Sequence, residues 1–420
     1  MLLIRNGYMI DPKSGREGNY DVLINGERII KIGKKLPCPV RGCEVIDAEG
    51  LLVAPGLVDV HVHFREPGYT RKEDIDTGAA AAARGGFTTV IMMANTNPSI
   101  DRPEVLRQVL DRGMGTGIHV LSCANVTMGM KGQELTPMKE LAAAGAVGFT
   151  DDGVPLLEEE LVRSAMKVAA ELDMPVSFHE ENPKYIENNG INRGVASEYF
   201  GIGGSSREAE IDLIGRDLEL ALETGACINI QHISTREGVE LVRQAKKRGS
   251  NIHAEATPHH FTLTEEAAIK YGTFAKMNPP LREEEDRLEI IRGLVDGTID
   301  IIATDHAPHT AEEKAKSITE APSGIIGLET SLALGITQLV DGGYLTMKQL
   351  LRLMSANPAS MYHLDAGYLE EGGPADVILI DTAARWIPEE YASRASNTPF
   401  TGWELKGRVI RTICGGNIIF

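Results

Sequence analysis

The segment Asp59-Val60-His61-Val62-His63-Phe64-Arg65 holds two histidines that stand two residues apart. The apolar residues around them predict a β-strand, and side chains two residues apart on a strand point to the same face. Imidazoles on one face at the end of a strand can bind one metal ion together. His61 and His63 are therefore candidate metal ligands, and Arg65 adds a fixed positive charge beside them.

Further candidate ligands follow other apolar runs, as Asp151-Asp152, His179-Glu180, Gln231-His232 and Asp305-His306. One such residue alone is usually structural. Imidazoles and carboxylates at the ends of several strands indicate a metal site, for which Zn²⁺ is the best ion and Mn²⁺ or Co²⁺ are substitutes. This set exceeds what one catalytic Zn²⁺ needs, so we favour two ions bridged by a carboxylate over one.

The bridging carboxylate is either Asp151 or Asp152. Alternation along a strand places Phe149 and Asp151 on one face and Asp152 on the other. We expect Phe149 to pack outward against helices, which turns Asp152 inward as the ligand. Asp151 is then expected to support the neighbouring loop.

The apolar runs that carry these residues alternate with helical patterns such as 158–172, 208–222 and 237–248. The runs are rich in Val and Ile, as buried parallel strands are. They cover residues 58–63, 88–95, 117–126, 146–152, 175–180, 226–232, 251–260 and 299–306. The alternation predicts an α/β fold, a (β/α)₈ TIM-type barrel, whose active site lies at the C-terminal ends of the strands. An open doubly wound sheet is the alternative, but it requires a Gly-x-Gly-x-x-Gly loop that does not follow the first run.

Both ends of the chain have the pattern of antiparallel β structure. Residues 21–24 and 28–32 flank Asn25-Gly26, which predicts a hairpin, and residues 376–380 and 407–413 are strand-like. We expect a small β-sandwich built from residues 1–54 and 366–420, with the barrel formed by residues 55–365. Two unrelated additions at the edges are the alternative.

Net charge, apolar runs and cysteines exclude several classes of protein. The chain has 420 residues and a net charge of −18, which argues against a nucleic-acid binder. We find no apolar run of the roughly 20 residues that span a membrane, and the start becomes polar too soon for a signal peptide. The five cysteines are scattered, which favours a reducing cytoplasm over a disulfide framework. We therefore expect a cytoplasmic protein whose partner is a small molecule.

Several motifs together resemble the cyclic amidohydrolase family, and within it the long-chain, type I dihydroorotase branch. They are Asp59–Gly68, Met93–Pro98, Thr150–Gly153, Ala303–His309 and Gly327–Thr330. The resemblance implies a metal-bearing barrel with a sandwich, and reversible cyclisation of N-carbamoyl-L-aspartate to L-dihydroorotate in pyrimidine biosynthesis. It implies that His61, His63 and Asp305 bind one metal and that His179 and His232 bind the other. Asp152 is shared, where many relatives use a carbamylated lysine.

The resemblance also implies roles toward the substrate. Metal-activated hydroxide attacks the ring amide, and Asp305 carries the proton. Arg65 pairs with the substrate carboxylate; the other expected contacts are His63, Asn95, Asn278, His309, Ser323 and Gly324. The alternatives are an Arg65–Glu66 salt bridge and a turn role for Asn278. Residues 310–322 are either a solvated loop or a lid.

Three functions are weighed: a dihydroorotase, a hydrolase of neutral rings such as hydantoin or allantoin, and a non-catalytic scaffold for aspartate transcarbamoylase. The absence of the bridging lysine and the presence of Arg65 argue against a hydrolase of neutral rings. The complete set of metal ligands argues against a non-catalytic scaffold. A homodimer and a complex with aspartate transcarbamoylase are both left open. His259 and His260 are expected either to be structural or to support the metal ligands without binding metal. His119 and His253 lie near strand starts, where residues more often serve stability.

Overall fold

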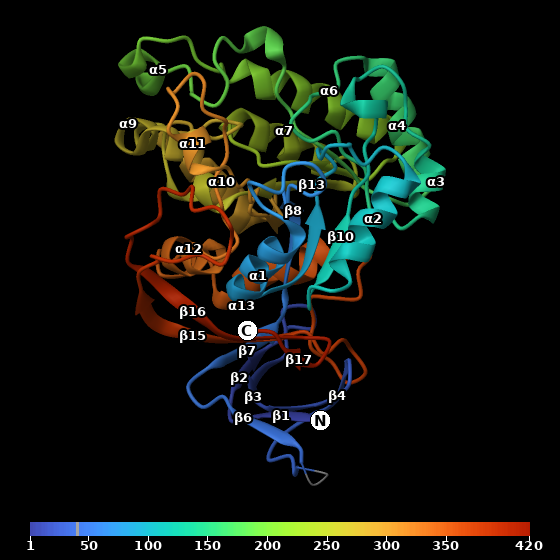
Figure 1. Ribbon diagram of the computed structural model, residues 1–420, viewed down its shortest axis with the longest axis vertical. Helices are drawn as coiled ribbons and strands as arrows, with labels where there is room; N and C mark the ends of the chain where they lie inside the picture. Colours follow the sequence, from blue (N-terminus) through green and yellow to red (C-terminus); the bar gives the residue numbers. More distant parts are fainter. Residues whose placement is uncertain (39–41) are drawn as a thin grey trace.

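The computed structural model describes residues 1–38 and 42–420 and has a broad part rich in helices above a narrower part made of strands (Figure 1). The strands are β1 Leu2–Arg5, β2 Tyr8–Ile10, β3 Glu17–Asn19, β4 Asp21–Asn25, β5 Arg28–Gly33, β6 Glu44–Asp47, β7 Leu52–Pro55, β8 Leu57–Val62, β9 Phe87–Met92, β10 His119–Ser122, β11 Val176–Phe178, β12 Ile228–Ile230, β13 Ile252–Ala256, β14 Ile301–Ile302, β15 Val377–Trp386, β16 Leu405–Cys414 and β17 Asn417–Ile418.

The helices are α1 Ile75–Gly85, α2 Pro103–Gly113, α3 Met138–Ala143, α4 Glu159–Glu171, α5 Val195–Phe200, α6 Glu208–Thr224, α7 Arg236–Lys246, α8 Pro258–Thr262, α9 Glu266–Tyr271, α10 Glu284–Asp296, α11 Ala311–Lys314, α12 Ser331–Leu334, α13 Met347–Leu351 and α14 Asn357–Met361. The predicted helices at 158–172, 208–222 and 237–248 are confirmed as α4, α6 and α7, with ends shifted by at most two residues. Their apolar faces recur at helical spacing, which fixes their positions better than their ends.

Two sheets form the narrow part, one from the start of the chain and one that combines strands from both ends. Their strand orders are β5-β4-β1-β6 and β17-β16-β15-β7-β2-β3. β7 joins the two ends, because it pairs with β15 in antiparallel and with β2 in parallel orientation. Apolar side chains of both sheets share one buried cluster, for example Ile4 and Val22 with Leu379. The predicted hairpin is confirmed as β4 and β5, with Asn25 opposite Arg28.

The parallel strands form two further sheets, of order β10-β9-β8 and β11-β12-β13-β14. All residues of β8 and β9 are buried, as expected for parallel strands covered on both faces. Single parallel bridges lie between the sheets, one from Val62 to His306 and two from Phe149, to Ala124 and Val176.

The predicted strand at 146–152 is too long. The structure has no regular strand there and pairs this run with its neighbours through bridges at Phe149. The Phe149 amide donates to Pro175 O at 3.0 Å, and Phe149 O accepts from the Ser177 amide at 2.9 Å. Asp151 ends the ladder, because its carboxylate accepts from the amides of Val126 and Thr127. Backbone pairing is thus present on either side of Phe149 but does not extend along the whole run.

The predicted strand at 251–260 is too long. β13 ends at Ala256, and α8 begins at Pro258. Proline suits the first turn of a helix, where no amide donor is needed, and Thr257 caps the helix by accepting from the His260 amide. Helix-starting residues therefore stop the strand before His259 and His260.

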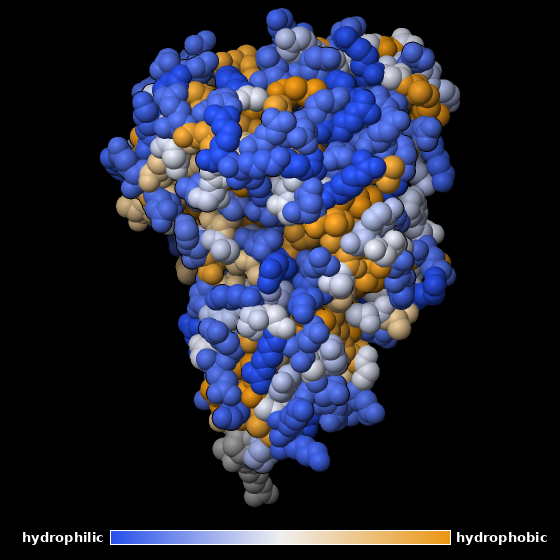
Figure 2. All heavy atoms as spheres, turned by 180° about the vertical axis from the view of Figure 1, so that it is seen from behind, coloured by the Kyte–Doolittle hydropathy of each residue, from blue (hydrophilic) through white to orange (hydrophobic). Residues whose placement is uncertain are grey.

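In the part of the chain that the structure describes, we find no helix long and apolar enough to cross a membrane. The face seen from behind is largely hydrophilic, with apolar atoms visible between the broad and the narrow part (Figure 2). The segment 387–404, between β15 and β16, extends toward the ends of the parallel strands. There, the Ile326 amide donates to Asn397 O at 3.0 Å.

Candidate metal centre and active site

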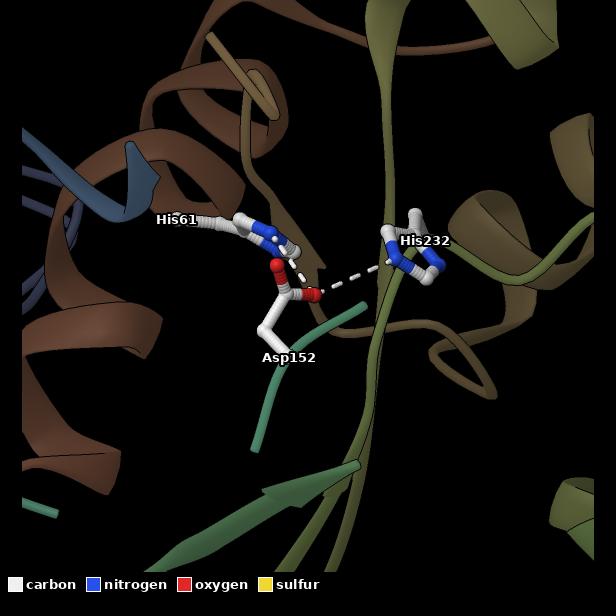
Figure 3. Close-up of side chains that lie close together, drawn as sticks. All are labelled: His61, Asp152 and His232. Atoms are coloured by element: carbon white, nitrogen blue, oxygen red, sulfur yellow. Dashed lines mark ion pairs between the residues drawn. The ribbon is translucent and has the colours of Figure 1, made fainter. Parts of the chain in front are cut away.

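Asp152 lies at the centre of a buried group of histidines. Its Oδ1 is 3.4 Å from His61 Nε2 and 3.7 Å from His232 Nε2, and both side chains point toward it (Figure 3). The same oxygen is 3.8 Å from His179 Nδ1, and Oδ2 is 3.4 Å from His63 Nε2. These residues are 2% to 6% exposed or fully buried. Four imidazoles thus surround one carboxylate.

Asp305 joins this group from the end of β14. Its Oδ1 lies 3.0 Å from His63 Nε2 and 3.6 Å from His61 Nε2. The ligand atoms of His61, His63 and Asp305 all lie within 4.8 Å of one another, as do those of His61, Asp152 and His232. These five residues therefore form two overlapping sets that share His61, and His179 lies beside the second set.

The donor atoms fit a metal ion. His61 Nε2 and Asp152 Oδ1 are buried and lack a hydrogen-bond partner among the described residues. Buried polar atoms rarely lack a hydrogen-bond partner. His61 Nε2 and Asp152 Oδ1 face one another without one in the described part of the chain, which a shared metal ion would explain. Imidazole nitrogens and carboxylate oxygens are ligands that divalent transition metals take in proteins. The chain therefore presents a candidate metal centre.

The far side of three imidazoles is held by polar side chains. His61 Nδ1 lies 2.5 Å from Glu255 Oε1, and His63 Nδ1 lies 3.0 Å from Asn95 Oδ1. His179 Nε2 lies 3.2 Å from Glu181 Oε2. Such contacts fix the tautomer and orientation of metal-binding histidines. His61 and His63 thereby direct Nε2, and His179 directs Nδ1, toward the shared space.

Electrostatics keep both aspartates ionised. Burial opposes ionisation of Asp305, but a hydrogen bond from His63 and the positive potential of His61 outweigh it and lower the pKa. Burial also opposes ionisation of Asp152, whose pKa is nevertheless held well below its usual value by His61 and His232. Burial lowers the pKa of His63, which favours its neutral, metal-binding form.

The backbone is strained at three residues of the site. Arg65, His232 and Asp305 have φ values of 59°, 33° and 47°. Non-glycine residues rarely adopt positive φ, and such residues cluster at active sites. The fold therefore holds these side chains where a relaxed strand would not place them.

A cavity of about 200 Å³ opens onto the candidate metal centre. It is lined by His63, Arg65, Asn95, Asp152, Gly153, His179, His232, Asn278, Asp305, Ala307, His309, Ser323 and Gly324. The structure thus brings the expected substrate contacts to the same cavity as the expected metal ligands, with His61 buried behind it. The alternative, a salt bridge between Arg65 and Glu66, is not observed, because Glu66 pairs with Arg112 at 3.1 Å.

Two polar contacts fix the wall around His309. His309 Nε2 lies 2.8 Å from Ser323 O, and His309 Nδ1 lies 3.3 Å from Lys72 Nζ. Burial and the charges of Arg65 and Lys72 lower the pKa of His309, so the ring is neutral. A neutral ring can donate from Nε2 and accept at Nδ1, which matches both contacts.

A profile of the amidohydrolase family matches residues 52–419. The chain belongs to the amidohydrolase family. Dihydroorotases are among its relatives: that of Clostridioides difficile (strain 630) is 53% identical over 420 residues, covering 100% of both chains. The dihydroorotase of Clostridium acetobutylicum is 50% identical over 422 residues, covering 100% of this chain and 99% of the relative.

Solved structures share the fold of this chain. The L-hydantoinase (dihydropyrimidinase) from Arthrobacter aurescens has a TM-score of 0.88 and 24% identity, covering 99% of this chain and 95% of that chain. The D-hydantoinase (dihydropyrimidinase) from Thermus sp. has a TM-score of 0.86 and 24% identity, covering 100% and 95%. The expected relation to the cyclic amidohydrolases is thus confirmed, together with an α/β fold that contains parallel sheets.

Sequence reasoning missed several residues of this amidohydrolase site. Glu255 is a carboxylate inside the apolar run of β13, and that position was a usable signal. Lys72 and Asn397 carry no such signal, because their loops have no regular pattern.

His259 and His260 are buried. His260 Nδ1 lies 2.8 Å from Thr257 Oγ1, and its Nε2 lies 3.1 Å from Pro279 O, as expected for a structural residue.

The segment 310–322 is more ordered than a purely solvated loop. It contains α11, and its far end is held by two lysines. Lys276 Nζ donates to Ala321 O at 2.7 Å, and Lys314 Nζ donates to Pro322 O at 2.9 Å. These contacts place the backbone of Ser323 and Gly324 at the cavity wall.

Proposed function

We propose that this protein interconverts L-dihydroorotate and N-carbamoyl-L-aspartate, a step of pyrimidine biosynthesis. The observation that carries the proposal is full-length identity of about 50% to dihydroorotases. It is supported by Arg65, which lies in the same cavity as the candidate metal ligands. A partly buried guanidinium there suits a substrate that carries a carboxylate. This activity makes the chain a hydrolase of cyclic amides.

We assign the metal ligands as the resemblance implied. His61, His63 and Asp305 would hold one Zn²⁺, His179 and His232 a second, and Asp152 would bridge them. Support comes from the short distances of Asp152 to all four imidazoles. Bound metal would lower the pKa of a water molecule to about 7 and polarise the amide carbonyl.

Asp305 is the proposed proton carrier. In the hydrolytic direction, the oxygen of water bonds to the ring amide carbon and the C–N bond breaks. Asp305 takes the proton of the water and delivers it to the leaving nitrogen. Its carboxylate is ionised and can accept a proton, and its place in the cavity wall gives it access to substrate. The reverse reaction runs the same steps backwards.

The remaining cavity residues would orient the substrate. Arg65 pairs with the carboxylate, with His309 beside it. Asn95 would add amide contacts to the carboxylate, Asn278 would also contact the substrate, and the backbone of Ser323-Gly324 would reach the ring. His63, besides binding metal, faces the same space.

We also propose that the parallel strands close into a (β/α)₈ barrel of residues 55–365, with a sandwich of residues 1–54 and 366–420. The bridges of Phe149 and of Val62 with His306 support closure, because they lie at both ends of the two parallel sheets. A cytoplasmic location goes with this function. Light scattering, alone and with aspartate transcarbamoylase, tests the homodimer and the complex that the sequence leaves open.

Initial rates on L-dihydroorotate, hydantoin and allantoin, measured with zinc-supplied protein, test the function. We expect turnover of L-dihydroorotate alone. Turnover of a neutral ring instead would overturn the assignment, and no turnover despite bound metal would favour a scaffold. Asp305→Asn should lower kcat by about 10²–10⁴; near-normal activity with full metal occupancy would exclude the proton role.

A further inference from the structure

A second group of side chains that could hold a metal ion lies away from the candidate active site, where the strand-rich part meets the start of β10. Its members are His119, Asp376 and Cys414. His119 is the first residue of β10, Asp376 directly precedes β15, and Cys414 ends β16. Val377 pairs with Ile413, so Asp376 and Cys414 are the next residues of the same antiparallel ladder. Two residues of one hairpin thus meet a histidine from a parallel strand.

The three side chains are close enough to share one ion. Their ligand atoms all lie within 4.8 Å of one another, and His119 Nε2 is 3.1 Å from Asp376 Oδ2. Asp376 is positioned by the Gly415 amide, which donates to its Oδ1 at 2.8 Å. Cys414 is 4% exposed, and its Sγ lies 3.6 Å from Thr88 O. The carboxylate and the thiol are thus held in place, whereas half of the His119 side chain is exposed.

The surroundings admit a hydrated cation. A cavity of about 320 Å³ is bordered by His119, Asp376 and Glu27. Arg28 also borders it but is paired with Asp365 at 2.9 Å. The carboxylates of Asp376 and Glu27 therefore give this cavity a negative potential, and its volume leaves room for water.

We propose that His119, Asp376 and Cys414 form a separate site for Zn²⁺ or a similar transition-metal ion. One imidazole nitrogen, one carboxylate oxygen and one thiolate sulfur are ligands that Zn²⁺ takes, and water from the cavity supplies the fourth. Binding releases the thiol proton, so the affinity rises with pH. The ion links β10 to the antiparallel pair β15–β16. His119, which the proposed reaction does not use, thereby holds the parallel strands to the strand-rich part of the molecule.

Cobalt distinguishes this site from the candidate catalytic centre. A thiolate bound to Co²⁺ gives strong charge-transfer absorption in the near ultraviolet, whereas histidine and aspartate ligands give only weak visible bands. We would titrate Co²⁺ into the full-length chelator-treated protein, with Cys38→Ser and Cys43→Ser removing the more exposed thiols. We expect a thiolate band that saturates at one Co²⁺ beyond those bound by the catalytic centre.

Variants assign the band to its ligands. Cys414→Ser should abolish it, and His119→Ala should weaken Co²⁺ binding at least tenfold. Cys227→Ser is the matched control, because Cys227 also neighbours a histidine–aspartate pair, His253 and Asp300, and this variant should keep the band. His61→Ala should keep it too, although it damages the catalytic centre. A wild-type protein without the band at saturating Co²⁺, or a band that survives Cys414→Ser, would overturn the proposal and leave His119 and Asp376 as an ion pair.

Discussion

Glu255 Oε1 lies 2.5 Å from His61 Nδ1, on the side of the imidazole away from Asp152 and Asp305. The same oxygen accepts from the His232 amide at 3.2 Å, and Glu255 Oε2 accepts from Asn229 Nδ2 at 3.0 Å. One buried carboxylate on β13 therefore holds the side chain of one proposed ligand and the backbone of another. It couples the geometry of β8 to that of β12.

Replacing this carboxylate tests that coupling. Glu255→Gln keeps the size but removes the charge that fixes the His61 tautomer. We expect metal affinity to fall about 10–100-fold, because contacts behind metal-binding histidines have effects of this size. Competition with a chromophoric chelator measures the affinity directly. Activity should return at high Zn²⁺, and an unchanged metal affinity would contradict the role.

Substitution of Asp152 should reduce metal content, whereas substitution of its neighbour Asp151 should reduce stability. Asp152→Asn removes the proposed bridging charge, so metal content should fall while the fold persists. Asp151→Asn instead weakens the contacts to the amides of Val126 and Thr127 and should cost about 1–3 kcal/mol in the free energy of unfolding. Metal analysis and urea unfolding of both variants give the comparison. Equal metal loss in the two would contradict the assignment of Asp152.

Asn397 should act on substrate binding from a distance. Its Nδ2 donates to Ala307 O and Gly324 O, both at 3.1 Å, and its Oδ1 accepts from the His309 amide at 3.1 Å. Asn397→Ala leaves these buried groups unpaired and loosens the wall that contains His309. We expect KM for L-dihydroorotate to rise about tenfold, because the three hydrogen bonds that hold this wall are lost. Metal content should stay normal, and Ser396→Ala, an exposed neighbour, should change neither quantity.

The pair of His253 and Asp300 predicts a pH-dependent contribution to stability. Burial lowers the pKa of His253, but hydrogen bonds to Asp300, at 2.7 Å, and to Cys227 outweigh it and raise the pKa to about 9. A raised pKa means that the folded state binds the proton more tightly, so the stabilisation is complete below about pH 6.5 and is lost as the pH rises through about 9.

Thermal unfolding of His253→Gln checks this sign. The loss in Tm relative to the unsubstituted protein should be larger at about pH 6 than at about pH 10. The double variant with Asp300→Asn should lose less than the sum of the two single variants at about pH 6, because the His253–Asp300 interaction is removed by either change. A difference in Tm that does not change with pH would contradict the protonated pair.

The sequence alone identified the candidate residues for chemistry and the order in which the elements follow. His61 and His63 share a strand parity, and the parity of Phe149 predicted that Asp152 rather than Asp151 faces the histidines, which is where the structure places it. These inferences depend on local periodicity, which the chain encodes within a few residues. The helices α4, α6 and α7 were predicted for the same reason.

Only the tertiary structure decided which distant residues support the site. Glu255 behind His61, Lys72 beside His309 and Asn397 under Gly324 meet through contacts that span many residues of chain. It also shortened the strand at Phe149, where Asp151 bonds to a neighbouring segment instead of continuing a ladder. Hydrogen-bond partners of buried polar groups are chosen by packing among elements, and no local pattern records that choice.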